Sequence, residues 1–222
     1  MVYGCVSFLG AFLLFFLQPF AAKAVTPWFG GGSHVWITCM VFGQAMLLLG
    51  YAYAHGLLTR VAPSRQARFH GTLLLAALLS LGITWGLSGI PLLPPQGLAR
   101  VEAPVWGVLG LLGATLGAPL LVLSATSPLA QAWYHRRHGG EVPYRFYALS
   151  NAGSLLGLLA YPFLAEPFLG LHAQAWMLAS LFSLFVVLMA LAGRGQIGPR
   201  AESGEVAVIR WPQRLEWVFL AF

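Results

Sequence analysis

The sequence predicts an all-α protein that crosses a membrane several times. Hydrophobic residues make up 59% of the 222-residue chain and charged residues only 8%, and the mean hydropathy is +0.77. Soluble proteins contain about 25% charged residues, so this composition excludes an ordinary soluble domain. The apolar residues also form runs of about 20, the length that a helix needs to cross a bilayer. We therefore expect a transmembrane bundle of six complete helices and the start of a seventh.

The apolar runs place these helices in order along the chain. Six are expected at residues 5–24, 34–58, 71–90, 104–124, 144–165 and 172–192. The PLLPP run that follows residue 90 ends the third helix, because proline cannot continue helical hydrogen bonding. Pro104 is well placed in the first turn of the fourth helix. A seventh helix begins at residues 214–222 but is too short to cross a bilayer, so we expect the chain to be truncated there.

The basic residues orient the bundle. Twelve Lys and Arg stand against six acidic residues, all of them Glu. Ten of the twelve fall between the second and third helices, between the fourth and fifth, or after the sixth, and only Lys23 and Arg100 fall on the other side. Lys and Arg accumulate in cytoplasmic loops. We therefore expect a cytoplasmic N-terminus, a bundle over residues 1–193 and a cytoplasmic linker over 194–213, with the cations as topology signals and not a nucleic-acid surface.

Polar residues interrupt the first helix and define a candidate site there. Pro19 has no amide hydrogen, so the carbonyl one turn earlier, near Phe15, loses its usual donor. Gln18 can supply a partner, and Lys23 and Trp28 follow toward the outer end. We predict that Gln18, Pro19, Lys23 and Trp28 form one unit that supports helix packing or binds a polar ligand. The alternative for Lys23 is that its ammonium extends to the membrane surface.

Small residues predict which helices pack closely. Without a hydrophobic driving force between membrane helices, glycine and alanine let backbones approach. The 144–165 helix carries Gly153 and Gly157 four residues apart, so we expect it to lie inside the bundle. The 104–124 helix is also rich in small residues, which makes it the expected neighbour. Its small residues are Gly107, Gly110, Gly113, Ala114, Gly117 and Ala118.

A second candidate site follows the fourth helix, in the stretch SATSPLAQAWYHRRHGG. Pro128 is placed to open a short helix that lies in the headgroup layer. Trp133 and Tyr134 would then lie at the interface, with Arg136 and Arg137 toward anionic lipid. The alternative is a solvated loop that carries the positive charge expected on the cytoplasmic side.

Four stretches carry a family resemblance. They are FLLFFLQPFAAKAVTPWFGG, VWITCMVFGQAMLLLGYAYAH, SPLAQAW and FYALSNAGSLLGLLAYPFLAEP, spread over residues 12–167. Together they resemble the membrane half of the bacterial fused MFS/spermidine synthase family. The resemblance implies a multi-pass protein of the bacterial cytoplasmic membrane. It also implies a soluble domain beyond this chain, similar to aminopropyltransferases, which use decarboxylated S-adenosylmethionine.

The chain itself offers no catalytic residue and no cofactor site. Aminopropyl transfer needs a carboxylate near the attacking amine and a Gly-rich turn between a strand and a helix. The sequence has no Asp, and its GGGS at residues 30–33 follows a membrane helix, so a turn is expected there instead of a phosphate site. A carrier of cations would need acidic groups near the bilayer midplane. The Glu residues lie instead beside helix ends or in loops.

Histidines and cysteines do not form a metal site in the sequence. His135 and His138 have helical spacing, but two arginines lie between them and no carboxylate is near. His55 is placed deeper in an apolar segment, where a structural hydrogen bond is the expected role and axial ligation of haem the alternative. Cys5 and Cys39 lie in apolar segments without metal-site spacing, as packing residues do. We therefore predict no metal and no cofactor.

Three functions remain open from the sequence. The chain is expected to be the non-catalytic membrane domain of a spermidine-synthase-like protein, which anchors or supplies a soluble domain. The first alternative is a non-catalytic structural or accessory subunit of a larger membrane complex, packed through small-residue helix faces. The second alternative is a small-molecule transporter. The expected partners are the lipid bilayer and other membrane helices or subunits, and no nucleic acid.

Overall fold

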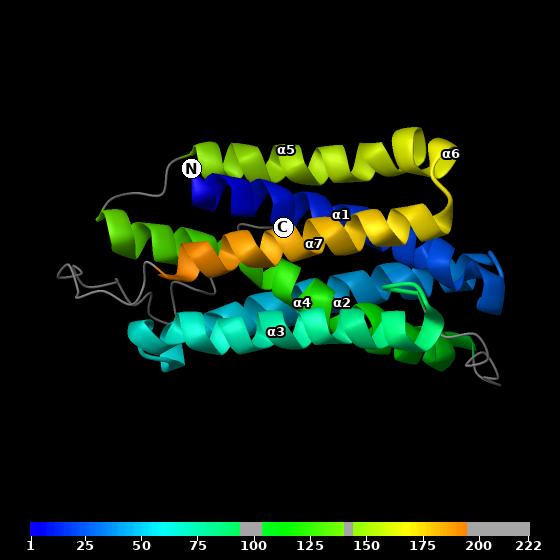
Figure 1. Ribbon diagram of the computed structural model, residues 1–222, viewed down its shortest axis with the longest axis horizontal. Helices are drawn as coiled ribbons and strands as arrows, with labels where there is room; N and C mark the ends of the chain where they lie inside the picture. Colours follow the sequence, from blue (N-terminus) through cyan, green and yellow to red (C-terminus); the bar gives the residue numbers. More distant parts are fainter. Residues whose placement is uncertain (94–103, 140–143, 195–222) are drawn as a thin grey trace, which may run out of the picture.

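The computed structural model describes residues 1–93, 104–139 and 144–194. These residues form helices and turns without a strand (Figure 1). Six of the helical segments are long and apolar enough to cross a membrane. The predicted class is confirmed: the chain is an all-α, multi-pass membrane protein. Residues 195–222, which hold the expected linker and the start of a seventh helix, lie outside the described residues.

The helices follow one another through short turns in the described parts of the chain. They are α1 (Val2–Phe29), α2 (Ser33–Arg60), α3 (Pro63–Ser88), α4 (Pro104–His138), α5 (Arg145–Ala160) and α7 (Leu171–Arg194). A π-helical turn, η1 (Tyr161–Ala165), continues α5 into the short α6 (Glu166–Phe168), so these three elements make one crossing. Pro162 lies in the widened turn, where its missing amide hydrogen interrupts the regular α-helical bonding.

Two helices are longer than predicted because internal prolines do not end them. α1 continues through Pro19 and Pro27, and α4 continues through Pro119 and Pro128. Inside a membrane bundle, neighbouring helices and local adjustments satisfy the carbonyls that proline leaves free. The predicted separate helix after Pro128 is therefore wrong, since that segment is the last part of α4.

The turns between the first helices are also tighter than predicted. α3 begins at Pro63. Proline suits the first helical turn because amide hydrogens there have no carbonyl partner within the helix, so proline costs no hydrogen bond. α1 and α2 are separated only by residues 30–32. Gly30 has φ 78°, a left-handed conformation that glycine adopts without strain. The turn expected at GGGS is thus confined to residues 30–32, because Ser33 already begins α2.

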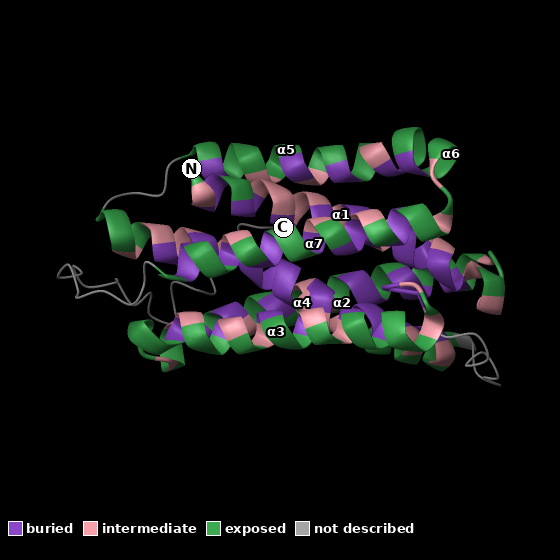
Figure 2. Cartoon of the chain, viewed as in Figure 1, coloured by how far each residue is buried: buried purple, intermediate pink, exposed green. Residues whose placement is uncertain are grey.

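α1 and α4 lie at the centre of the bundle. α1 packs against α5, α4, α7 and α2, and α4 packs against α2, α1, α3 and α7. The largest fully buried side chains of these two helices include Phe16, Phe20, Leu120 and Leu129. Figure 2 shows the outer helices α3 and α5 with long exposed stretches. The exposed side chains of α3 and α5 are largely apolar, as expected of faces turned toward lipid.

The most extensive helix contacts repeat when the first three crossings are exchanged for the last three, whereas the smaller α1–α2, α2–α3 and α4–α7 contacts have no counterpart of similar extent in the described residues. The extensive α1–α5 interface corresponds to the extensive α2–α4 interface, and α1–α7 corresponds to α3–α4. The same exchange turns α1 into α4 and α3 into α7, so the α1–α4 and α3–α7 contacts are each mapped onto themselves. Three crossings are an odd number, so the second half enters the membrane from the side opposite to the first. The fold thus consists of two three-helix halves in inverted topology, a plan common among transporters.

Two buried glutamines occupy equivalent places in these halves. Gln66 in α3 and Gln174 in α7 are both 0% exposed, and each donates its amide N–H groups to carbonyls at the end of the preceding crossing. The bonds run from Gln66 Nε2 to Leu57 O (3.2 Å) and Val61 O (2.8 Å), and from Gln174 Nε2 to Ala165 O (3.2 Å) and Leu169 O (2.8 Å). In both halves the acceptors lie nine and five residues before the glutamine. Each glutamine therefore fixes the turn between two crossings.

Glycines of α5 do allow a close approach, but to a different helix from the one predicted. A Cβ at Gly153 would lie 2.4 Å from the Phe8 carbonyl oxygen, and one at Gly157 would lie 2.5 Å from that of Phe12. The close contact is confirmed, and the partner is α1. α4 and α5 share no extended interface in the described residues. The predicted α4–α5 pair is wrong, and so is the interior position of α5, which lies at the edge of the bundle.

Candidate functional site

A cavity of about 890 Å³ opens at the end of the bundle where α1 begins and α4 ends. The first turn of α5 and the last part of α7 complete its wall. Its lining combines three basic side chains with apolar and aromatic ones. The residues are Met1, Val2, Tyr3, Gly4, Cys5, Phe8, Leu9, Tyr134, Arg137, His138, Arg145, Phe146, Leu149, Leu184 and Leu188.

The basic residues reach the cavity because two helix ends meet there. Arg137 and His138 are in the last turn of α4, which extends this far only because the helix continues through Pro128. Arg145 begins α5. All three side chains are exposed, and in the described part of the chain no acidic side chain forms an ion pair with them. The mouth of the cavity is therefore positively charged.

Aromatic rings hold the cavity mouth in place. The Tyr134 ring stacks on His138 with centroids 4.2 Å apart and meets Phe146 edge-on at 4.7 Å. Tyr3 packs edge-on against Tyr134 at 5.6 Å, and its hydroxyl donates a 3.1 Å hydrogen bond to the Ala192 carbonyl oxygen. These contacts connect α1, α4, α5 and α7, so the cavity has a defined shape.

The predicted lipid-contact residues divide between two sides of α4. Tyr134 and Arg137 line the cavity. Trp133 is only 1% exposed, and its indole Nε1 donates to Gln66 Oε1 (3.3 Å). Arg136 Nη1 donates to the same oxygen (2.5 Å). The predicted interfacial position of Trp133 is wrong, because neighbouring residues on a helix point about 100° apart and this ring faces α3.

The predicted unit on α1 is not brought together either. The Gln18 side chain packs against α2, where a Cβ at Gly43 would lie 3.3 Å from its amide carbon. Lys23 Nζ instead forms an ion pair with Glu166 Oε1 at 2.6 Å. Pro19 and Trp28 are both half-buried. Five positions on a helix rotate a side chain by about 140° from its starting direction, so Gln18 and Lys23 meet different neighbours.

Sequence reasoning missed Glu166 as the partner of Lys23. Both residues lie near the same membrane boundary, in crossings that face each other, and this shared depth is the signal that the sequence contained. The neighbouring Gln174 Oε1 is buried without a hydrogen-bond partner in the described residues, and the buried Tyr161 hydroxyl interacts with the Glu166 carboxylate. The C-terminal end of α1 and the α5–α6 crossing thus form a small polar cluster within an apolar bundle.

The Lys23–Glu166 pair is expected to contribute little to stability. The side chains are 35% and 44% exposed, and exposed ion pairs measure about 0.2–1 kcal/mol. In a double-mutant cycle of Lys23→Met and Glu166→Gln, thermal unfolding in detergent should give a coupling energy below about 1 kcal/mol. A coupling of several kcal/mol would show instead that the pair is shielded from solvent and joins the two crossings.

The histidines and cysteines only partly follow the predictions, with Cys39 packed in the core as expected. His55, predicted to lie deep, is exposed, whereas His70 is 1% exposed. His70 Nδ1 lies 3.3 Å from the Tyr53 hydroxyl, and its ring meets Trp133 edge-on. Cys5 is exposed, Cys39 is buried, and both are free thiols. Among the described residues no three His, Cys, Asp or Glu side chains gather into a metal-binding group.

Comparison with known proteins adds no relative to this description. No protein-family model, no curated protein and no solved structure matches the chain. The resemblance to the fused MFS/spermidine synthase family therefore stays a prediction from the sequence motifs. The geometry of the bundle is the basis for the functional proposal.

Proposed function

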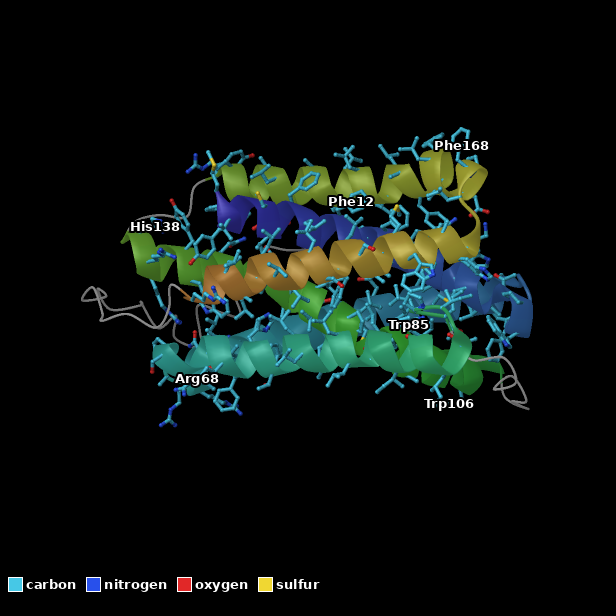
Figure 3. The ribbon with its side chains drawn as sticks, viewed as in Figure 1. Phe12, Arg68, Trp85, Trp106, His138 and Phe168 are labelled. Atoms are coloured by element: carbon cyan, nitrogen blue, oxygen red, sulfur yellow. The ribbon has the colours of Figure 1, made fainter. Side chains whose placement is uncertain are left out.

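We propose that this chain is the non-catalytic membrane domain of a spermidine-synthase-like protein of the bacterial cytoplasmic membrane, with its N-terminus in the cytoplasm. Its cationic end would face the soluble domain that the family resemblance implies. The observation that carries this proposal is the separation of charge along the bundle. Figure 3 has Arg68 and His138 at the same end. Among the described residues that end also holds Arg60, Arg65, Arg136, Arg137, Arg145 and Arg194, and Lys23 is the sole Lys or Arg near the other.

Tryptophans mark the opposite end of the bundle as the second membrane boundary. Five of the six tryptophans in the described residues lie in or next to the terminal turn of a helix at that end: Trp28, Trp36, Trp85, Trp106 and Trp176. Figure 3 labels Trp85 and Trp106 there, and Trp85 meets Trp176 edge-on with centroids 5.6 Å apart. Tryptophan favours the membrane–water interface. The bundle therefore spans the bilayer between a basic end and an aromatic end.

The interior of the bundle favours a scaffold role over catalysis. Its buried hydroxyls, such as those of Thr115, Ser124 and Thr126, donate to carbonyls of their own helix. No carboxylate is buried among the described residues. A catalytic acid or base needs a position within reach of a bound substrate, and the buried His70 of the described interior packs instead between Tyr53 and Trp133. The large cavity is at the basic end instead.

Two other functions remain as alternatives. An accessory subunit of a membrane complex would use the long exposed apolar faces of α3 and α5, which lie on opposite sides of the central helices. A small-molecule transporter is favoured by the inverted three-helix halves, since transporter folds are often built from such repeats. In that case a second six-helix unit would be needed to enclose a substrate path, and the purified chain would form dimers.

Cysteine labelling in intact cells tests the proposed orientation. In a background with Cys5→Ala and Cys39→Ala, a reactive thiol is introduced by Ser64→Cys at the start of α3 or by Ser33→Cys at the start of α2. Both sites are exposed and lie at opposite ends of the bundle. A membrane-impermeant maleimide added outside the inner membrane should label the Ser33→Cys protein and not the Ser64→Cys protein.

The reverse labelling pattern would show that the orientation is wrong. Labelling of both sites in intact cells would indicate a mixed topology and would also contradict the proposal. A separate result bears on the catalytic assignment. Measurable putrescine-dependent aminopropyl transfer by the purified chain would contradict a non-catalytic domain.

A further inference from the structure

We propose that the cavity at the basic end binds an anionic phospholipid, with its phosphate at Arg137, His138 and Arg145 and an acyl chain along the apolar wall. This binding site goes beyond the anchoring role proposed above and does not depend on it. Basic pockets between transmembrane helices on the cytoplasmic side recognise anionic headgroups. The cavity combines such a pocket with an apolar channel in the same space.

The headgroup end of the cavity is built for a phosphate. Arg137 and Arg145 come from two different helices, and guanidinium groups can hold phosphate oxygens through paired hydrogen bonds. His138 Nδ1 lies 3.1 Å from the Tyr134 carbonyl oxygen. A carbonyl only accepts hydrogen bonds, so Nδ1 carries a hydrogen, and Nε2 donates to a phosphate oxygen when the ring is in its imidazolium form. The stacked Tyr134 ring keeps the imidazole in this orientation.

The inner wall of the cavity suits a hydrocarbon chain. Phe8 and Leu9 of α1, Leu149 of α5, and Leu184 and Leu188 of α7 line it. The cavity volume of about 890 Å³ falls within the range of ligand pockets, about 300–1,000 Å³. A free phosphate or a nucleotide would leave this apolar lining in contact with water. A bound acyl chain removes both itself and this apolar lining from water, while the phosphate contacts the basic side chains.

The cavity can be reached sideways from the bilayer. α5 and α7 both contribute lining residues, yet they share no extended interface in the described residues. Leu149 is 37% exposed and Leu184 is 50% exposed on these two helices. A lipid chain can therefore enter between α5 and α7 while the headgroup stays at the membrane surface. This lateral access favours a lipid over a water-soluble anion.

Native mass spectrometry of the delipidated, detergent-purified chain tests the proposal. Phosphatidylglycerol and phosphatidylcholine with the same acyl chains are titrated into the wild type and into Arg137→Gln/Arg145→Gln. The matched control is Arg65→Gln/Arg68→Gln, which removes the same charge from exposed positions on α3, outside the cavity. Each Arg near an anionic headgroup contributes about 1 kcal/mol. The cavity variant should thus bind phosphatidylglycerol about 30-fold more weakly, and the control should match the wild type.

Two further measurements separate a lipid site from an anion site. Leu184→Trp should narrow the channel and weaken phosphatidylglycerol binding while leaving all the charges in place. Inorganic phosphate at millimolar concentration should not displace the lipid. Equal binding of the two lipids, unchanged binding by the cavity variant, or full displacement by inorganic phosphate would each overturn the proposal. Circular dichroism and gel filtration of each variant confirm that it is folded before it is titrated.

Discussion

Replacing Gln66 with leucine is expected to lower the free energy of unfolding by about 3 kcal/mol. The amide nitrogen donates to carbonyls at the end of α2, and the amide oxygen accepts from Trp133 Nε1 and Arg136 Nη1. Leucine fits the apolar surroundings but removes all these side-chain hydrogen bonds, although Leu57 O keeps its bond from the Val61 N–H. The loss is larger than for a single membrane hydrogen bond, about 0.6 kcal/mol on average, because one side chain connects three helices. Thermal and SDS-induced unfolding of the purified protein measure it.

The equivalent replacement in the second half of the fold is the matched control. Gln174 makes the same two carbonyl contacts through Nε2, but its Oε1 has no hydrogen-bond partner in the described residues. Gln174→Leu therefore removes an unpartnered buried acceptor together with two bonds, and these effects partly offset each other. The expected loss is about 1 kcal/mol. Equal destabilisation by the two variants would show that the Trp133 and Arg136 contacts contribute nothing.

A methyl group at Gly153 or Gly157 is expected to separate α5 from α1. The added Cβ would lie 2.4 Å and 2.5 Å, respectively, from a backbone oxygen of α1, closer than real Cβ atoms approach any atom. Backbone cannot move aside as a flexible side chain can, so the helices must shift apart. Overpacking of this kind costs about 1–3 kcal/mol at each site, and Gly153→Ala/Gly157→Ala should reach the sum if the sites act independently. Unfolding in detergent and cross-linking between α1 and α5 would report the change.

Glycines of α4 provide the control for this experiment. A Cβ at Gly110, Gly113 or Gly117 would have no neighbouring atom within 4 Å. Alanine also has a higher helix propensity than glycine by about 1 kcal/mol. Gly113→Ala should therefore leave stability unchanged or raise it slightly. A loss at Gly113 similar to that at Gly153 would mean that α4 packs through its glycines after all, as the sequence had led us to predict.

The sequence could predict the class of the protein and the order of its crossings, because both depend on local composition. Runs of about 20 apolar residues have one stable arrangement in a bilayer, a helix that satisfies its own backbone hydrogen bonds. The helix ends were less predictable. Pro27 and Pro128 would end a helix in water, but the surrounding helices let α1 and α4 continue through them.

The candidate sites needed the tertiary structure, because their residues come from crossings distant in sequence. The sequence alone identified Lys23 and the basic run after Pro128 as unusual. It could not show that Lys23 pairs with Glu166, that Trp133 and Arg136 bond Gln66, or that Arg137 joins Arg145 at a cavity. A helix turns by about 100° per residue, so adjacent side chains meet different neighbours. Close packing between helices decides which neighbour each side chain meets. Hydrophobicity cannot decide it, because the helix surfaces and the lipid are similarly apolar.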